Sequence, residues 1–145
     1  MIAIRAMQAK DVDEVAAIES RIFSQPWSKQ GFLDSLALEH AVFLVAEEEN
    51  HILGYIGMYV SLDEGEITNV AVDSIARCRG IGAMLVEAMK NEAGLLEVTQ
   101  IVLEVRVSNE SAIRLYERSG FINQGVRRGF YDMPKEDAYI MLYGQ

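Results

Sequence analysis

The fold is decided by a stretch that reads Ile67-Thr68-Asn69-Val70-Ala71-Val72, then Arg77-Cys78-Arg79-Gly80-Ile81-Gly82, and later Leu103-Glu104-Val105-Arg106-Val107. The first and third runs are rich in β-branched residues, which favour strands. Between them, the residues from Gly82 to Gly94 carry apolar side chains at helical spacing. A second helical segment follows the third run. Strands and helices that alternate in this way are typical of α/β proteins.

The segments on either side complete a mixed sheet. Short polar turns separate three consecutive apolar runs, which predict antiparallel strands over residues 41–46, 52–62 and 66–72. Further strands are expected near residues 2–7, 100–107, 121–128 and 138–143. We therefore predict a single α/β domain over residues 1–145, with helices on both faces of its sheet.

Polar residues mark the expected helix starts. Asp11 is expected to cap the first helix, with Glu14 as its capping-box partner. Ser28 is expected to cap the second helix after the break at Pro26-Trp27. Gly120 suits the residue just past the last helix, where a positive φ is common.

Composition narrows the possible functions. The chain has a net charge of −9, which argues against broad nucleic-acid binding, because phosphate contacts need clustered Lys and Arg. A single cysteine, Cys78, excludes an internal disulfide and is consistent with a reducing, cytoplasmic setting. No apolar run approaches the roughly 20 residues that span a bilayer, and no secretory signal is expected. No cluster has metal-ligand spacing, so no metal is expected.

The segment from Arg77 to Gly82 is a candidate phosphate cradle. It lies between an expected strand and an expected helix, where backbone N–H groups lack internal partners and the helix dipole favours anions. Its glycines allow close approach of an anion, and its arginines add positive charge. It is neither a Walker loop nor a dinucleotide fingerprint, because Leu85 occupies the third glycine position. The alternative is a glycine-rich turn without a ligand.

Glu104 is the candidate catalytic carboxylate. Side chains alternate along a strand, so Leu103 and Val105 share one face while Glu104 and Arg106 share the other. A carboxylate in the middle of an apolar strand is unfavourable unless it is paired or functional. The alternative is an ion pair between Glu104 and Arg106 on a solvated face.

Two residues of the following helix are further candidates. Ser108 or Asn109 can cap that helix, and the amide of Asn109 could also contact a ligand. Tyr116 lies one turn after Ala112 and is expected to face the sheet. The alternative for Tyr116 is an ordinary core tyrosine.

Taken together, these segments resemble the GCN5-related N-acetyltransferases (GNAT), whose cofactor loop reads Arg/Gln-x-x-Gly-x-Gly/Ala. Further stretches resemble the RimI type, the bacterial ribosomal-protein-alanine N-acetyltransferases. They are Pro26-Trp27-Ser28, Thr68–Asp73, Leu103–Arg106, Ser108-Asn109, Leu115-Tyr116, Gly120-Phe121 and Glu136-Asp137-Ala138. The resemblance implies a mixed, mostly antiparallel sheet of about seven strands with splayed central strands, and about four helices on both faces.

The resemblance also implies acetyl-CoA as donor and assigns roles to residues. Glu104 matches the general base and Tyr116 the general acid. The backbone of Val70, Ala71 and Val72 is expected to line the pantetheine arm and bind the thioester carbonyl. The other contacts expected for CoA come from the backbone N–H groups of Cys78, Arg79, Gly80, Ile81, Gly82 and Ala83, and from Asn109.

The implied acceptor is a protein N-terminus, in this branch the N-terminal alanine of a small-subunit ribosomal protein. Tyr131 and Glu136 are the candidate acceptor-binding residues. Alternatives are a lysine side chain, a polyamine or another small amine as acceptor, or a non-catalytic acetyl-CoA-binding module. The presence of both Glu104 and Tyr116 argues against the module. A monomer or weak dimer is expected.

Overall fold

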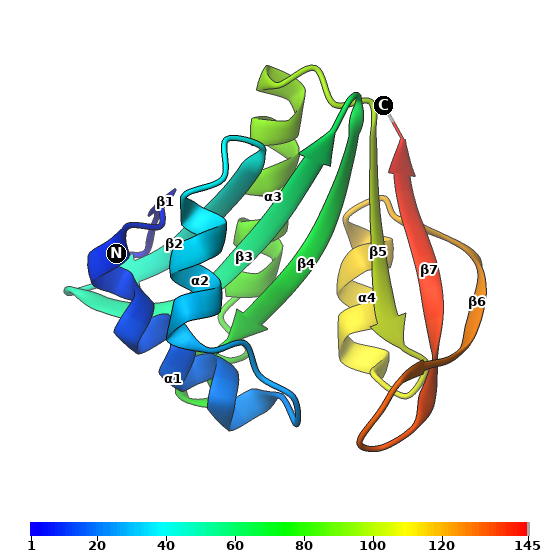
Figure 1. Ribbon diagram of the computed structural model, residues 1–145, viewed down its shortest axis with the longest axis horizontal. Helices are drawn as coiled ribbons and strands as arrows, with labels where there is room; N and C mark the ends of the chain where they lie inside the picture. Colours follow the sequence, from blue (N-terminus) through cyan, green and yellow to red (C-terminus); the bar gives the residue numbers. More distant parts are fainter. Residues whose placement is uncertain (145) are drawn as a thin grey trace.

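A seven-stranded sheet organises the computed structural model, which describes residues 1–144 (Figure 1). Its strands lie in the order β1-β2-β3-β4-β5-β7-β6, and every neighbouring pair is antiparallel except β4 and β5. The predicted mixed, mostly antiparallel sheet is therefore confirmed. The strands are β1 (Ala3–Ala6), β2 (Ala41–Glu48), β3 (His51–Ser61), β4 (Glu64–Val72), β5 (Gln100–Arg106), β6 (Ile122–Tyr131) and β7 (Glu136–Gly144).

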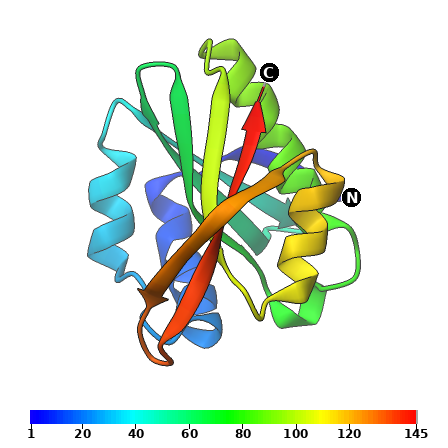
Figure 2. The same cartoon turned by 90° about the vertical axis from the view of Figure 1, so that its right-hand side faces the viewer.

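Four α-helices cover the sheet: α1 (Val12–Ile22), α2 (Lys29–Leu36), α3 (Ile81–Leu95) and α4 (Glu110–Arg118). Figure 1 shows α1 and α2 in front of β2–β4, and α3 behind the same strands. Helix α4 lies beside β5, on the side shown in Figure 2. No helix among the 144 described residues is long and apolar enough to cross a lipid bilayer.

The central strands are apolar on both faces because each face packs into its own core. Along β2, Leu44 belongs to the cluster beneath α3, whereas Phe43 and Val45 belong to the cluster beneath α1 and α2. Along β3, the fully buried Tyr55 faces α1 and α2, and Ile56 faces α3. Strands buried on both sides read as continuous apolar runs, as these do.

The sheet opens at its centre, between β4 and β5. These strands pair over three positions only, Glu64–Glu66 with Gln100–Val102, and they diverge beyond (Figure 1). The other edge of β5 pairs with β7 along its whole length. The facing edges of β4 and β5 therefore carry backbone groups without a neighbouring strand, and such groups need another partner.

A bulge lies in β4 at the start of this opening. Gly57 of β3 pairs with Asn69, but the next residue, Met58, pairs with Ile67. Thr68 is thus the extra residue on β4. A bulge bends its strand and locally disrupts the ladder, and bulges are frequent beside active sites.

One expected helix cap is wrong and two helix ends are confirmed. Asp11 makes no side-chain cap to α1; it ends a short 3₁₀ helix, and its carboxylate accepts hydrogen bonds from the Arg5 guanidinium at 2.8 and 2.9 Å. It also accepts from the Gln8 N–H at 2.8 Å, so Asp11 is the capping-box partner of the 3₁₀ helix and not a side-chain cap of α1. Ser28 does cap α2, accepting from the Gly31 N–H at 3.1 Å. Gly120, just past α4, has a φ of 95°.

Candidate active site

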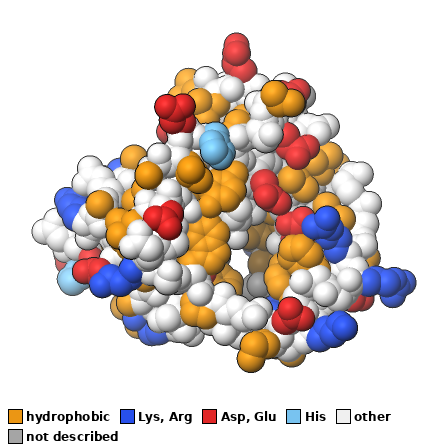
Figure 3. All heavy atoms as spheres, viewed as in Figure 1, with side chains coloured by type: hydrophobic (Ala, Val, Ile, Leu, Met, Phe, Trp, Pro, Cys, Tyr) orange, Lys and Arg blue, Asp and Glu red, His pale blue; other side chains and the backbone are white. Residues whose placement is uncertain are grey.

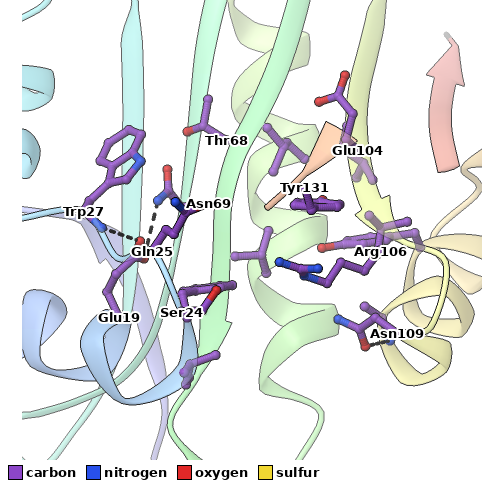
Figure 4. A pocket seen from close by; sticks show the side chains of 18 of the residues that line it. Glu19, Ser24, Gln25, Trp27, Thr68, Asn69, Glu104, Arg106, Asn109 and Tyr131 are labelled. Carbon is purple, nitrogen blue, oxygen red and sulfur yellow. Dashed lines mark hydrogen bonds between the residues drawn. The ribbon is translucent and has the colours of Figure 1, made fainter. Parts of the chain in front are cut away.

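A cleft of about 520 Å³ occupies the opening between β4 and β5. Figure 3 shows the surface hollowed at this position. In Figure 4, Trp27 and Asn69 lie on one side of the cleft, and Glu104, Arg106 and Tyr131 on the other. Its lining comes from the loop after α1 (Phe23–Gln25, Trp27), from β4 (Ile67–Val70), from β5 (Leu103–Arg106), from α4 and its cap (Asn109, Ala112, Tyr116), and from Glu19, Ile22, Tyr131 and Pro134.

Glu104 stands in the wall of the cleft as the strand alternation predicts. Its side chain is 13% exposed, and within residues 1–144 its one side-chain partner is the Nη1 of Arg127, at 3.5 Å. Burial raises the pKa of the Glu104 carboxyl, the charge of Glu66 raises it further, and Arg127 lowers it. A carboxylate with a raised pKa, open to a cleft and weakly paired, is suited to accept a proton.

The alternative ion pair between Glu104 and Arg106 does not form. Arg106 instead donates to Glu136 Oε1 at 3.2 Å and to the backbone oxygens of Pro134 and Asp132. Its guanidinium also lies 4.3 Å from the ring centroid of Tyr131. Arg106 therefore anchors the loop between β6 and β7 and leaves Glu104 available.

Tyr116 faces the same cleft from α4. It is 7% exposed and packs against Phe121, with ring centroids 5.8 Å apart. Burial raises the pKa of its hydroxyl above the ordinary value, and the neighbouring Tyr131 adds to this. A phenol that keeps its proton at neutral pH is suited to donate one.

The two residues expected to bind the acceptor occupy different positions. Tyr131 lines the cleft, and burial together with the Glu104 charge raises its pKa to about 12. Glu136 lies outside the cleft lining. Its carboxylate accepts from the Ser108 N–H at 2.8 Å and from Arg106, so both oxygens already have partners. The structure therefore brings Tyr131, but not Glu136, together with Glu104.

The candidate phosphate cradle has the conformation of an anion site. Gly80 adopts a left-handed φ of 76° immediately before α3, and no side chain caps the helix there. A Cβ on Gly80 would meet no atom within 4 Å, so an anion can approach the backbone at this residue. Among the described residues, no acceptor receives a hydrogen bond from the backbone N–H groups of residues 78–83. Such a row of free donors at a helix N-terminus favours a phosphate.

Neighbouring residues of the cradle serve the fold as well. A Cβ on Gly82 would lie 3.0 Å from Leu115 Cδ2, so this glycine permits close packing of α3 against α4. The Arg79 guanidinium binds both carboxylate oxygens of Glu48, at 3.0 and 2.8 Å, and lowers the pKa of that carboxyl. Much of the positive charge expected from Arg79 is therefore neutralised, and its backbone N–H remains. Cys78 is exposed, with a φ of 65°.

Asn109, rather than Ser108, caps α4. Its Oδ1 accepts from the Ala112 N–H at 3.2 Å, and its amide lies at the edge of the cleft (Figure 4). Because only the oxygen is used for the cap, the Nδ2 group remains as a donor toward a ligand. Of the β4 residues expected to line the pantetheine arm, Val70 contacts the cleft, Ala71 is buried and Val72 is half-buried.

A buried carboxylate on α1 is the cleft residue that the sequence reasoning missed. Glu19 is 2% exposed, and its carboxylate accepts from the Tyr55 hydroxyl at 2.6 Å and from the Trp27 N–H at 3.0 Å. The sequence does carry a signal for it. Glu19 follows Val15 by four residues and precedes Ile22 by three, so it interrupts the apolar stripe of α1.

The arrangement combines four elements that one reaction can use. They are a row of free N–H groups for an anionic carrier, unpaired strand edges for its arm, a carboxylate to take a proton and a phenol to give one. Together they suit transfer of an acyl group from a phosphate-bearing carrier to a nucleophile.

Comparisons with known proteins agree with this chemistry. The Acetyltransferase (GNAT) family matches residues 12–121. The [ribosomal protein bS18]-alanine N-acetyltransferase of Salmonella typhimurium is 34% identical over 143 residues, covering 97% of this chain and 96% of that protein. The corresponding Escherichia coli K12 enzyme is 32% identical over the same length, with the same coverage.

Solved structures show the same fold. The crystal structure of the Escherichia coli ribosomal-protein-S18-alanine N-acetyltransferase superposes with a TM-score of 0.91 at 32% identity, covering 99% of this chain and 94% of that one. Arabidopsis thaliana NAA60 in complex with acetyl-CoA gives a TM-score of 0.89 at 22% identity over the full length of both chains. The predicted GNAT-like sheet with splayed central strands is thus confirmed. The chain belongs to the GNAT acetyltransferase family and is an acetyl-CoA-dependent N-acetyltransferase.

Proposed function

We propose that this enzyme acetylates the α-amine of a protein, namely the N-terminal alanine of a small-subunit ribosomal protein. The observation that carries the proposal is its similarity, over nearly the full length of both chains, to enzymes named for that reaction. The cleft is consistent with it, because the loop after α1 and Tyr131 line the opening that contains Glu104 and leave space for a peptide end. Since ribosomal proteins are made in the cytoplasm, we place the enzyme there.

In this proposal Glu104 is the general base. An α-amino group has a pKa of about 7.7–8.0, so most of it is protonated at neutral pH and cannot attack a thioester. Glu104 takes the proton, directly or through a water molecule, and the neutral amine attacks the acetyl carbonyl. The apolar strand around Glu104 and its neighbour Glu66 favour proton uptake, because both raise the pKa of its carboxyl.

Backbone donors and Tyr116 complete the transfer. The attack places negative charge on the carbonyl oxygen, and N–H groups on the unpaired edge of β4 near Val70 are the proposed donors to it. Collapse of this species breaks the carbon–sulfur bond, and Tyr116 gives its proton to the departing thiolate. The raised pKa keeps the phenol protonated at neutral pH but also makes it a weak acid, so this proton transfer contributes less than that of Glu104.

The CoA moiety is proposed to lie across the same opening. The N–H groups of residues 78–83 bind the pyrophosphate, and the strand edge over residues 70–72 follows the pantetheine arm. The free Nδ2 of Asn109 contacts CoA from α4. Val70 and Asn109 line the cleft together with Glu104, and residues 78–83 lie outside that lining, at the start of α3.

The charges around Glu104 predict opposite pH shifts for two variants. Glu104 acts as a base only when deprotonated, so kcat falls as the pH drops through its raised pKa. Glu66→Gln removes the charge that raises this pKa, and the acidic limb should move to lower pH. Arg127→Gln removes the charge that lowers it, and the limb should move to higher pH. Profiles of kcat against pH at saturating substrates measure both shifts. If the acidic limb moved in the same direction in both variants, the assignment of Glu104 as the base would be contradicted.

A panel of acceptors tests the proposed substrate. It compares peptides with an N-terminal alanine, lysine peptides blocked at the N-terminus, and spermidine, each with acetyl-CoA. We expect turnover of the alanine peptides at a kcat/KM at least about tenfold above the other amines. Turnover confined to blocked lysine peptides or spermidine would overturn the proposed acceptor.

A further inference from the structure

The wall of the cleft opposite Glu104 contains a buried amide with an unused oxygen. Asn69 lies on β4, is 5% exposed and lines the cleft (Figure 4). Its Nδ2 donates to Glu19 Oε1 at 3.4 Å, whereas no group within residues 1–144 donates to its Oδ1. A buried carbonyl oxygen without a donor is unfavourable, and each such group in a folded protein needs an explanation.

Glu19 fixes which way this amide points. A carboxylate only accepts hydrogen bonds, so the Nδ2 group of Asn69 must face Glu19, and a flipped amide would place two oxygens together. Glu19 cannot easily turn away, because it is held by the Tyr55 hydroxyl at 2.6 Å and the Trp27 N–H at 3.0 Å. The Oδ1 of Asn69 is therefore directed away from Glu19 before any substrate binds, and because this oxygen is buried, the acceptor amine reaches it only after a small shift of the cleft wall.

The reaction supplies the missing donor. A primary ammonium group has three N–H bonds, and Glu104 removes only one proton before attack. The neutral amine keeps two N–H bonds, and once its lone pair points at the thioester, at least one of these N–H groups needs an acceptor other than Glu104. Asn69 suits this task because its oxygen accepts strongly but is uncharged, so it does not compete with Glu104 for the proton.

We propose that Asn69 Oδ1 accepts a hydrogen bond from the acceptor amine and orients it against Glu104. Asn69 then binds the substrate directly, and Glu19 is a positioning residue that acts through it. This inference rests on the proposed function only in requiring a primary amine as acceptor. Asn69 is thus a recognition element on β4, whereas the general base, Glu104, lies on β5.

Asn69→Leu, which keeps the size of the side chain and removes its polar atoms, tests the proposal. We expect kcat/KM for an N-terminal alanine peptide to fall at least about tenfold, the scale of one lost hydrogen bond to a charged group. The KM for acetyl-CoA should stay within about twofold, because the contacts proposed for CoA on β4 are backbone groups and do not involve the Asn69 side chain. Asn69→Ala serves as the second variant if the leucine disturbs folding.

A pair of peptides separates direct contact from a structural effect. One carries the N-terminal amine and the other has hydrogen in its place, and calorimetry measures the binding of each to the enzyme–CoA complex. Wild type should prefer the amine, and this preference should fall at least about fivefold in the Asn69 variants. An unchanged preference in variants that still bind CoA would overturn the proposal.

Controls distinguish this result from other failures. Ser35→Ala removes a buried hydroxyl on α2, outside the cleft, that bonds to Tyr59 at 2.7 Å. It should leave the amine preference unchanged. If wild type acetylates a lysine peptide or spermidine instead of the alanine peptide, the proposed function fails. The same comparison, with that acceptor and its desamino analogue, then decides the role of Asn69.

Discussion

Glu104→Gln should lower kcat by about 10²–10⁴-fold, the usual contribution of a general base. Glutamine has the shape of glutamate and still accepts a hydrogen bond, but it cannot take a proton from the amine. The acidic limb of the kcat profile should also disappear, because that limb reports the titration of the Glu104 carboxyl. Steady-state rates from pH 5 to 9 at saturating acetyl-CoA and peptide measure both the fall in kcat and the loss of the acidic limb.

Two variants on α4 show whether the effect is specific to Glu104. Glu117→Gln makes the same chemical change at an exposed position and should leave kcat unchanged. Tyr116→Phe should cost less than Glu104→Gln, because a thiolate, with a thiol pKa near 8.5, is already a fair leaving group. A Glu104→Gln enzyme that keeps its acidic limb would show that another group accepts the proton.

Gly80→Asp should raise the Kd for CoA at least about tenfold relative to Gly80→Asn. Asn and Asp tolerate the left-handed conformation of Gly80 better than other residues with a Cβ, so the pair shares its backbone strain. The two side chains differ by one negative charge at the point where the pyrophosphate is proposed to lie. Calorimetric titration with CoA measures the difference.

The stability of the same pair should change in the opposite sense. A carboxylate at the N-terminus of α3 interacts favourably with the helix dipole, by about 0.3–1 kcal/mol. Gly80→Asp should therefore have a melting temperature equal to or above that of Gly80→Asn while it binds CoA less well. Equal CoA affinities for the two variants would place the pyrophosphate away from the start of α3.

The sequence predicted the sheet because its signals are local. Apolar runs between short turns specify the antiparallel strands β2, β3 and β4, and the glycine turn followed by helical spacing specifies α3. The alternation along β5 placed Glu104 correctly. In contrast, the side-chain cap expected from Asp11 on α1 was wrong, because that carboxylate binds the Gln8 N–H and the Arg5 guanidinium of β1.

The contacts within the polar network of the cleft could not be predicted for the same reason, although the break in the apolar stripe of α1 marks Glu19 itself. Glu19, Tyr55 and Asn69 come from α1, β3 and β4, and only the folded sheet brings them together. Glu136 is a residue that was expected to bind the acceptor but has structural partners instead. Its carboxylate was expected in the acceptor groove, but it is held by Arg106 and the Ser108 N–H, thirty and twenty-eight residues away in sequence.

A crystal structure with a covalent conjugate of CoA and an alanine peptide would show whether the opening between β4 and β5 is the catalytic site. We expect pyrophosphate oxygens within about 3.5 Å of backbone nitrogens at the start of α3. We also expect the alanine nitrogen between β4 and β5, in contact with the Glu104 carboxylate directly or through one water molecule. A conjugate bound outside this opening, or a Glu104 side chain turned away from the alanine nitrogen, would contradict this expectation.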